Sequence, residues 1–124
     1  MSKVTSADLI AAAKAAIDHI SVDDAKPLAG GGDVVFVDVR DSKELEAGAI
    51  PGAVHAPRGG LEFALDPASD FAVAELVSGK RLVMVCGSGG RAAFATKLAK
   101  DMGHDAVCLE GGFKGWKAGG GPVA

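Results

Sequence analysis

A chain of 124 residues is long enough for one domain with a single core and too short for two. Its formal net charge of −3, with 48% hydrophobic and 23% charged residues, gives no reason to expect nucleic acid or an anionic membrane as a partner. No apolar run reaches the roughly 20 residues that span a bilayer, and the first residues lack the apolar region of a signal peptide, so we expect a cytoplasmic location.

Residues 6–18 are predicted to form a helix that packs on the rest of the chain. Thr5 and Asp8 are close to a capping box. Apolar residues follow at helical spacing: Leu9, Ala13, Ile17 and Ile20. We therefore place a domain boundary after residue 18 and expect residues 19–124 to form one domain.

Three apolar runs are predicted to be buried strands, at residues 34–37, 82–85 and 106–109. Shorter strands are expected around residues 19–21 and 53–56. Because helical patterns separate these strands, the sequence indicates an α/β domain with a mainly parallel central sheet and helices on both faces.

The expected helices differ in length. Short helices are predicted at residues 22–30, 41–48 and 71–79, whereas residues 57–70 are expected to be irregular. A longer helix follows residue 90, with one apolar stripe ending at Gly103 and made of Phe94, Leu98 and Met102. Phe113 and Trp116, one helical turn apart, are expected in the core.

Polar and reactive residues follow the predicted strands. Asp38 and Arg40 come after the first buried run, Cys86 after the second and Glu110 after the third. Sites in open α/β sheets form at the carboxyl ends of the strands. We therefore expect these residues to share one functional edge.

A dinucleotide site is one interpretation of this edge. Gly87, Gly89 and Ala92 fit the G-x-G-x-x-A fingerprint, and Glu110 lies near the position of the acid that binds ribose. However, only 14 residues follow Glu110, too few for the second half of such a site. The fingerprint also normally opens its fold, whereas here strands precede it, so we do not favour this interpretation.

A reactive thiolate at Cys86 is the second interpretation of this edge, and it accounts for more of the residues there. The loop that follows is small enough for its amides to converge on the sulfur: Gly87, Ser88, Gly89 and Gly90. A helix N-terminus after the loop favours negative charge there, and Arg91 would either hold an anionic substrate or pair with a strand-end acid. Cys108, inside an apolar strand, is expected to be structural, and neither a metal nor a cofactor is predicted.

Three segments in this order resemble the rhodanese-like domain family, from about Ile20 to the C-terminus. They are "VVFVDVRDSKELEAGAIPGAVHAP", "VCGSGGRA" and "LEGGFKGW". The resemblance implies a single-domain sulfurtransferase in which Cys86 takes a sulfane sulfur from thiosulfate or a persulfide. Cys86 would then pass that sulfur to cyanide or a thiol, including a thiol on a protein, and residues 87–91 would bind the substrate.

The resemblance also separates related activities. Four residues lie between Cys86 and Arg91, which is the sulfurtransferase size, whereas phosphatase and arsenate reductase relatives have one more. A low-turnover module that carries or senses persulfide for a partner is the main alternative. Asp38 and Arg40 are expected to brace the loop rather than touch substrate, with Glu44 as a partner of Arg40.

Two loop positions depart from the family pattern. Many members have a cationic or polar residue at the position of Gly87, and serine or threonine at that of Ala92. The loss of the cation weakens the case for thiosulfate as the donor, and Arg58 is the residue that we expect to replace it at the mouth of the site. His55 could reach the site, but a Cys–His pair is not expected because the loop already supplies activation.

Overall fold

Five parallel strands form the central sheet of the computed structural model, which describes residues 2–124. The strands are β1 (His19–Ile20), β2 (Val34–Asp38), β3 (Val54–His55), β4 (Arg81–Val85) and β5 (Ala106–Leu109). Their spatial order is β1-β5-β4-β2-β3, and every neighbouring pair is parallel. The predicted fold class is therefore confirmed, with a sheet that is wholly rather than mainly parallel.

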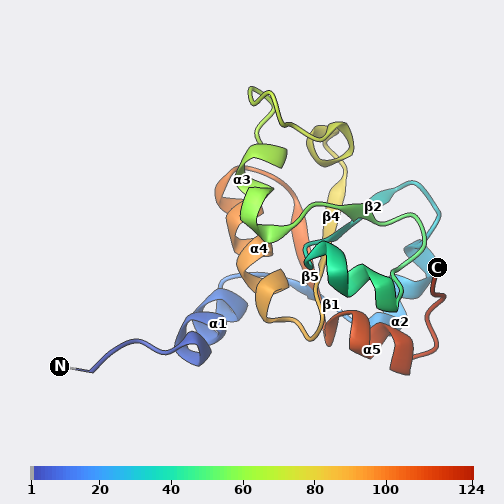
Figure 1. Ribbon diagram of the computed structural model, residues 1–124, viewed down its shortest axis with the longest axis horizontal. Coiled ribbons are helices and arrows are strands. Elements are labelled where there is room, and N and C mark those ends of the chain that lie inside the picture. Colours follow the sequence, from blue (N-terminus) through green and yellow to red (C-terminus); the bar gives the residue numbers. More distant parts are fainter. Residues whose placement is uncertain (1) are drawn as a thin grey trace.

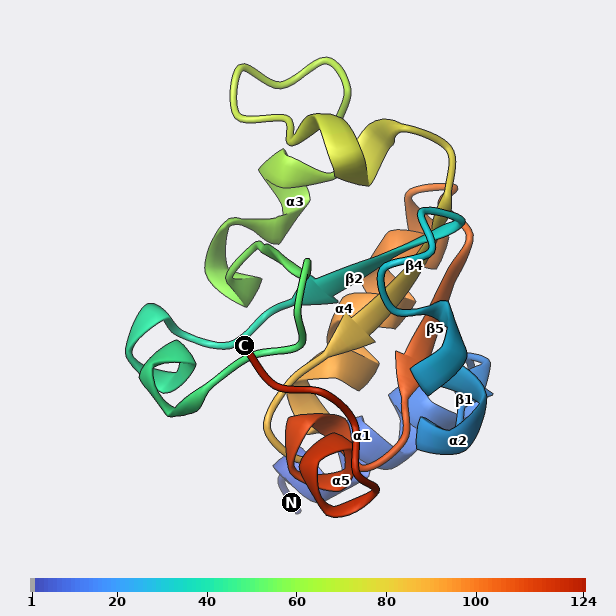
Figure 2. The ribbon, with the colours of Figure 1, turned by 90° about the vertical axis from the view of Figure 1, so that its right-hand side faces the viewer.

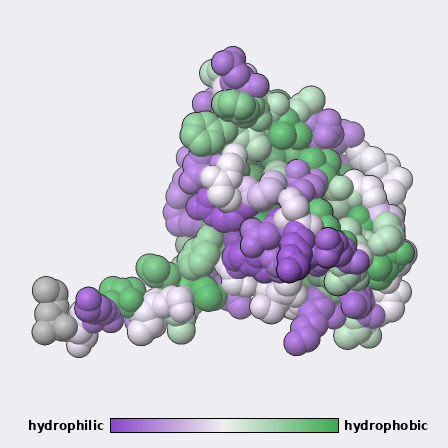
Figure 3. Space-filling view, viewed as in Figure 1, coloured by the Kyte–Doolittle hydropathy of each residue, from purple (hydrophilic) through white to green (hydrophobic). Residues whose placement is uncertain are grey.

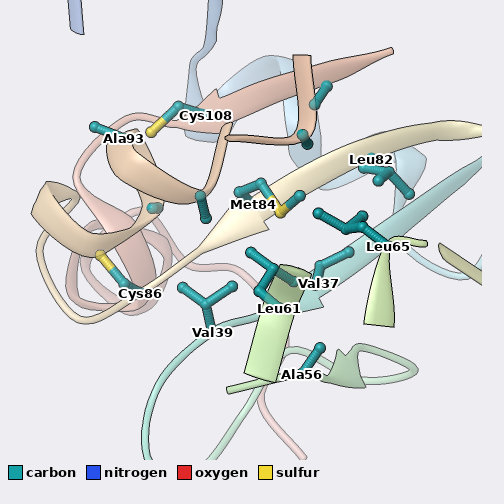
Figure 4. Close-up of a cluster of buried hydrophobic side chains, with 14 of the residues drawn as sticks. Val37, Val39, Ala56, Leu61, Leu65, Leu82, Met84, Cys86, Ala93 and Cys108 are labelled. Carbon is teal, nitrogen blue, oxygen red and sulfur yellow. The ribbon is translucent and has the colours of Figure 1, made fainter. Parts of the chain in front are cut away.

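Helices cover both faces of this sheet (Figures 1 and 2). One face carries α1 (Ser6–Ala15), α3 (Leu61–Ala64) and α4 (Gly90–Asp101), and the other carries α2 (Val22–Ala25) and α5 (Gly112–Ala118). Because side chains alternate along a strand, Leu82 and Met84 of β4 join the first layer, whereas Val83 and Val85 join the second. Figure 4 shows the first layer, into which Cys86 and Cys108 also point.

The register of the strands determines which residues meet at the functional edge of the sheet. Asp38 at the end of β2 pairs with Val85 at the end of β4, and Cys86 follows directly. On the other side of β4, Met84 pairs with Cys108 near the end of β5. The residues that follow the three central strands therefore meet at one edge of the sheet, as parallel strands require.

The N-terminal helix is shorter than predicted and buries less. The Thr5–Asp8 capping box is present, but α1 ends at Ala15 instead of residue 18, because the chain must turn there into β1. Ala13 and Ile17 are buried, whereas Leu9, expected on the same stripe, is 53% exposed. Helix α1 packs chiefly on α4, and Leu9 lies outside that contact.

The predicted short helices form only one or two turns each, most of them 3₁₀ helix. Residues 22–30 divide into α2 and η1 (Lys26–Leu28), and residues 41–48 form η2 (Ser42–Ala47). Only η4 (Ala74–Val77) forms within residues 71–79, because Val73 N–H bonds to the Ala64 carbonyl and keeps the preceding chain in turns. The segment expected to be irregular contains η3 (Arg58–Gly60) and α3.

The predicted stripe of the longer helix holds except at its end. Phe94 and Leu98 pack against the core, but Met102 lies just past the end of α4 and is 38% exposed. Phe113 and Trp116 of α5 are buried as expected, and Trp116 meets the Phe36 ring edge-on with 5.7 Å between centroids. Helix α5 is thereby anchored to the sheet through its aromatic residues.

Polar side chains dominate part of the surface. On the face shown in Figure 3, hydrophilic residues gather over η2, while residues 2–5 extend away from the rest of the molecule. Within residues 2–124, every helix is too short or too polar to cross a bilayer.

Replacing Trp116 tests the anchoring of α5. We expect Trp116→Ala to lower the free energy of unfolding by about 3–5 kcal/mol, because it removes the largest fully buried side chain. Phe71→Ala is the matched control: Phe71 is 74% exposed, so its loss is expected to cost less than about 1 kcal/mol. Urea unfolding curves measure both, and similar losses for the two variants would contradict the assignment.

Candidate active site

Cys86 lies at the end of β4, beneath the loop that leads into α4. Its Sγ accepts a hydrogen bond from the Gly89 amide at 3.0 Å, and the residue is only 1% exposed. Gly89 has a φ of +120°, in the left-handed region, which lets its N–H turn back onto the sulfur. Within residues 2–124, this is the one amide that contacts Sγ, whereas the sequence suggested that several would converge.

The first turn of α5 holds the backbone on the other side of the loop. The Phe113 amide donates to the Cys86 carbonyl at 2.7 Å, and the Lys114 amide donates to the Gly87 carbonyl at 3.1 Å. A Cβ on Gly112 would lie 2.5 Å from the Cys86 carbonyl oxygen and 2.8 Å from the Gly87 carbonyl. Glycine is therefore needed at position 112, the first residue of α5, so that this turn can approach the loop that follows Cys86.

Asp38 and Arg40 form a buried ion pair behind the loop. The guanidinium donates to the Asp38 carboxylate at 2.8–3.2 Å and also reaches the Gly48 carbonyl at 2.9 Å. Arg40 also lies over the Phe113 ring, 4.4 Å from its centroid. Both residues are at least 96% buried, and the bracing of the loop that the sequence analysis expects of them stays a prediction.

The partner of Glu44 differs from the expected one. Arg40 reaches only the backbone carbonyl of Glu44, at 3.4 Å, whereas the Glu44 carboxylate makes a bidentate pair with Arg91 at 2.6 and 2.8 Å. Arg91 thus pairs with an acid, but that acid lies in η2 rather than at a strand end. This hydrogen bond lowers the pKa of Glu44 to about 2 and raises the pKa of Arg91.

The remaining candidates lie away from the sulfur. The Arg58 guanidinium pairs with Glu62 at 3.0 Å, and Arg58 lines neither of the hollows beside the loop. The His55 ring contacts the Arg40 carbonyl at 2.8 Å. Within residues 2–124, neither side chain contacts Cys86.

Cys108 differs from Cys86 in its surroundings. It lies within β5, is 1% exposed, and its Sγ makes long contacts, at 3.9–4.0 Å, to the Gly89 and Leu109 carbonyls. Burial, together with the nearby Cys86, raises the pKa of the Cys108 thiol to about 11. A neutral thiol is a poor nucleophile, which fits the structural role expected for Cys108.

Two hollows flank the loop. The first, about 340 Å³, is lined by Gly89, by Lys14 of α1, and by His19, Cys108 and Glu110 at the β1–β5 side. The second, about 370 Å³, is lined by Gly87 and Ser88 of the loop, by Ala47, and by Phe113, Lys114 and Lys117 of α5. The two lysines were not singled out from the sequence, because the segment that holds them was interpreted only as core.

Gly112→Ala tests the contact between α5 and the loop. We expect it to lower the free energy of unfolding by about 1–3 kcal/mol more than Gly120→Ala does, and to speed alkylation of Cys86 by displacing the loop. Gly120 is a matched control because its φ of +80° imposes a similar backbone strain while a Cβ there meets no atom within 4 Å. Equal effects of the two variants on stability and alkylation would contradict the proposed constraint.

The Arg91–Glu44 pair predicts a specific titration. Because the pKa of Glu44 falls from 4.5 to about 2 in the folded protein, the pair stabilises fully above pH 4.5, and this stabilisation is lost as the pH falls towards 2. Carboxyl NMR titration should find the Glu44 pKa near 2 and, in Arg91→Ala, higher but still below 4.5, because the Asp41 amide still donates to the carboxylate. Arg81→Ala, which removes the exposed pair with Asp105, should leave the Glu44 pKa unchanged.

Comparison with known proteins gives a consistent family. The model of the rhodanese-like domain matches residues 21–119. The human thiosulfate:glutathione sulfurtransferase is 34% identical over 104 residues, which are 78% of this chain and 90% of that protein. A tRNA uridine(34) hydroxylase of Rickettsia bellii is 38% identical over 81 residues, but these are 64% of this chain and only 32% of that protein, so the chain spans about a third of this relative's length.

A solved structure resembles nearly the whole chain. This protein of Rhodopseudomonas palustris, described as a possible tyrosine phosphatase, is 38% identical with a TM-score of 0.93. The match covers 100% of this chain and 97% of that one. The strand-end cysteine, its glycine loop and the docked α5 turn thus occur in a fold shared across these proteins: the chain belongs to the rhodanese-like domain family.

Proposed function

We propose that this protein is a sulfurtransferase that carries a sulfane sulfur as a persulfide on Cys86. The observation that supports this most directly is the Gly89 amide aimed at Cys86 Sγ, at the start of the 12-residue helix α4. A hydrogen-bond donor and a helix N-terminus both favour negative charge on the sulfur. The thiolate is the form of cysteine that attacks sulfur.

The reaction needs two displacements at sulfur. The Cys86 thiolate attacks the outer sulfur of the donor, a new S–S bond forms, and the donor's own S–S bond breaks. With thiosulfate, sulfite leaves with the bonding electron pair. An acceptor thiolate or cyanide then attacks the outer sulfur of the persulfide, and Cys86 leaves as a thiolate, so no external oxidant or reductant is required.

Other residues of the site act on Cys86 indirectly. The turn of α5 fixes the Cys86 and Gly87 carbonyls, and Arg91 fixes the start of α4 to η2 through Glu44. Rigid placement lowers the cost of aligning the sulfur with its donor. The four-residue spacing to Arg91 favours sulfur transfer over hydrolysis of a phosphate ester.

The phosphatase alternative has one specific observation in its favour, the description of the Rhodopseudomonas palustris protein as a possible tyrosine phosphatase. Hydrolysis of para-nitrophenyl phosphate by this chain, dependent on Cys86, would support that alternative. Sulfur loading without such hydrolysis would support the sulfurtransferase.

Sulfur loading tests the proposal and separates the two cysteines. Protein is incubated with thiosulfate, and separately with glutathione persulfide, and its intact mass is measured before and after cyanide is added. We expect a gain of one sulfur atom that cyanide removes as thiocyanate. Cys86→Ala should abolish the gain, whereas Cys108→Ala should retain it, because the Cys108 thiol is neutral and lies within β5.

The remaining outcomes are also informative. Loading followed by very slow release to cyanide and glutathione would favour the persulfide carrier that acts with a partner. Loading that persists in Cys86→Ala, or no loading from either donor, would overturn the proposal.

A further inference from the structure

The arginines around the site are all paired with carboxylates. Arg40 is paired with Asp38 and Arg91 with Glu44, and the more distant Arg58 is paired with Glu62. Such pairing cancels most of the field that each guanidinium would exert on an anion beside the loop. The free positive charge that an anionic substrate would need must therefore come from other residues.

Helix α5 supplies such charge at the hollow beside Gly87. Lys114 and Lys117, both exposed, line this hollow of about 370 Å³ together with loop residues Gly87 and Ser88. Within residues 2–124, neither lysine forms an ion pair, and no carboxylate lines the hollow. Two unpaired ammonium groups thus lie at a concave surface next to the nucleophile loop.

The lysines are positioned relative to Cys86 by the backbone. Lys114 N–H donates to the Gly87 carbonyl, and its neighbour Phe113 donates to the Cys86 carbonyl. Lys117 Nζ lies 5.5 Å from the centroid of the Phe113 ring, which keeps it on the side of α5 that faces the hollow. The turn of α5 that fixes the Cys86 carbonyl therefore carries Lys114, and Lys117 follows in the last turn of the same helix.

The hollow on the other side of the loop is less suited to an anion. Lys14 is there, but Glu110 lines the same hollow and opposes negative charge. His19, also in its lining, bonds through Nε2 to the Lys14 carbonyl. The two hollows are similar in volume, so their charge is what distinguishes them.

We propose that the α5 hollow is the docking site for the oxyanion group of a doubly charged sulfur donor, with thiosulfate as the chemical type. This inference rests on the proposed function and names its substrate class. Lys114 and Lys117 hold the sulfonate-like oxygens, and Ser88 lines the same hollow. The lysines take the role of the cation that the loop lacks at Gly87, and they stabilise sulfite as it leaves with the electron pair of the broken S–S bond.

Charge removal on α5 tests the donor site. We expect the double variant Lys114→Gln/Lys117→Gln to raise the thiosulfate concentration needed for half-maximal loading of Cys86 by about tenfold, with little change in the maximal rate. Loading is followed by intact mass with no acceptor present, so that only the donor step is measured. Lys80→Gln is the matched control, because Lys80 is an exposed lysine that precedes β4 at the opposite end of the sheet.

Added salt and substitution of Lys14 give two further tests of the α5 hollow. Added NaCl should weaken thiosulfate loading of the native protein more than that of the double variant, since the screened charges are absent from the variant. Lys14→Gln should have a smaller effect than either α5 substitution. An unchanged half-maximal concentration in the double variant would overturn the inference, as would an equal effect of Lys80→Gln.

Binding without turnover distinguishes this inference from the proposed function. In Cys86→Ala, thiosulfate should shift the amide NMR signals of Gly87, Ser88 and Lys114, and the two lysine substitutions should weaken this binding by a similar factor. If the native protein takes no sulfur but this binding is seen, the proposed function fails and the anion site stands. If the native protein loads sulfur but the lysine variants bind thiosulfate unchanged, the anion site fails alone.

Discussion

The hydrogen bond from the Phe113 amide to the Cys86 carbonyl is the contact on which the rest of the site depends. It joins the end of β4 to the start of α5, two segments far apart in the chain, at a point where only glycine at position 112 allows the approach. Because Phe113 and Trp116 are buried in the core, the packing of α5 helps to fix the position of the loop that follows Cys86. A free glycine-rich loop has many accessible conformations, so ordering it costs conformational entropy. The hydrogen bonds from α5 to the Cys86 and Gly87 carbonyls offset that cost.

The buried ion pair of Asp38 and Arg40 reinforces the packing of α5. Arg40 lies over the Phe113 ring and is itself held by Asp38 and by the Gly48 carbonyl, so the end of η2 and the first turn of α5 are tied together. Burying two charges costs several kcal/mol of desolvation, which the multiple hydrogen bonds of this pair offset. We infer that the pair serves positional specificity more than stability, since apolar residues of the same volume would fill the space without fixing Phe113.

The parts of the fold that depend on local sequence were predictable, whereas those that depend on distant contacts were not. The runs at β2, β4 and β5 are apolar, and the one at β2 is mostly β-branched, so their own composition indicates buried strands. Leu9 has the right spacing to be buried, but no distant segment covers it. Glu44 was matched with Arg40 because they are close in sequence, although its actual partner, Arg91, is 47 positions away. Lys114 and Lys117 carry no local signal at all; their proximity to the loop follows from the docking of α5.

The arginines and the lysines near the loop differ in their contacts. Arginine binds carboxylates through a planar fork with fixed geometry, and here Arg40 and Arg91 are used in that way, to hold the scaffold. Lysine presents a compact charge on a flexible stem, and the lysines of the α5 hollow are left without partners in the part of the chain that the structure describes. A donor whose leaving group is an anion benefits from charge that follows it as the S–S bond breaks, which flexible lysines can do and paired arginines cannot. With the proposed donor site, glycine at position 87 is compatible with an anionic donor, because Lys114 and Lys117 of α5 supply the positive charge.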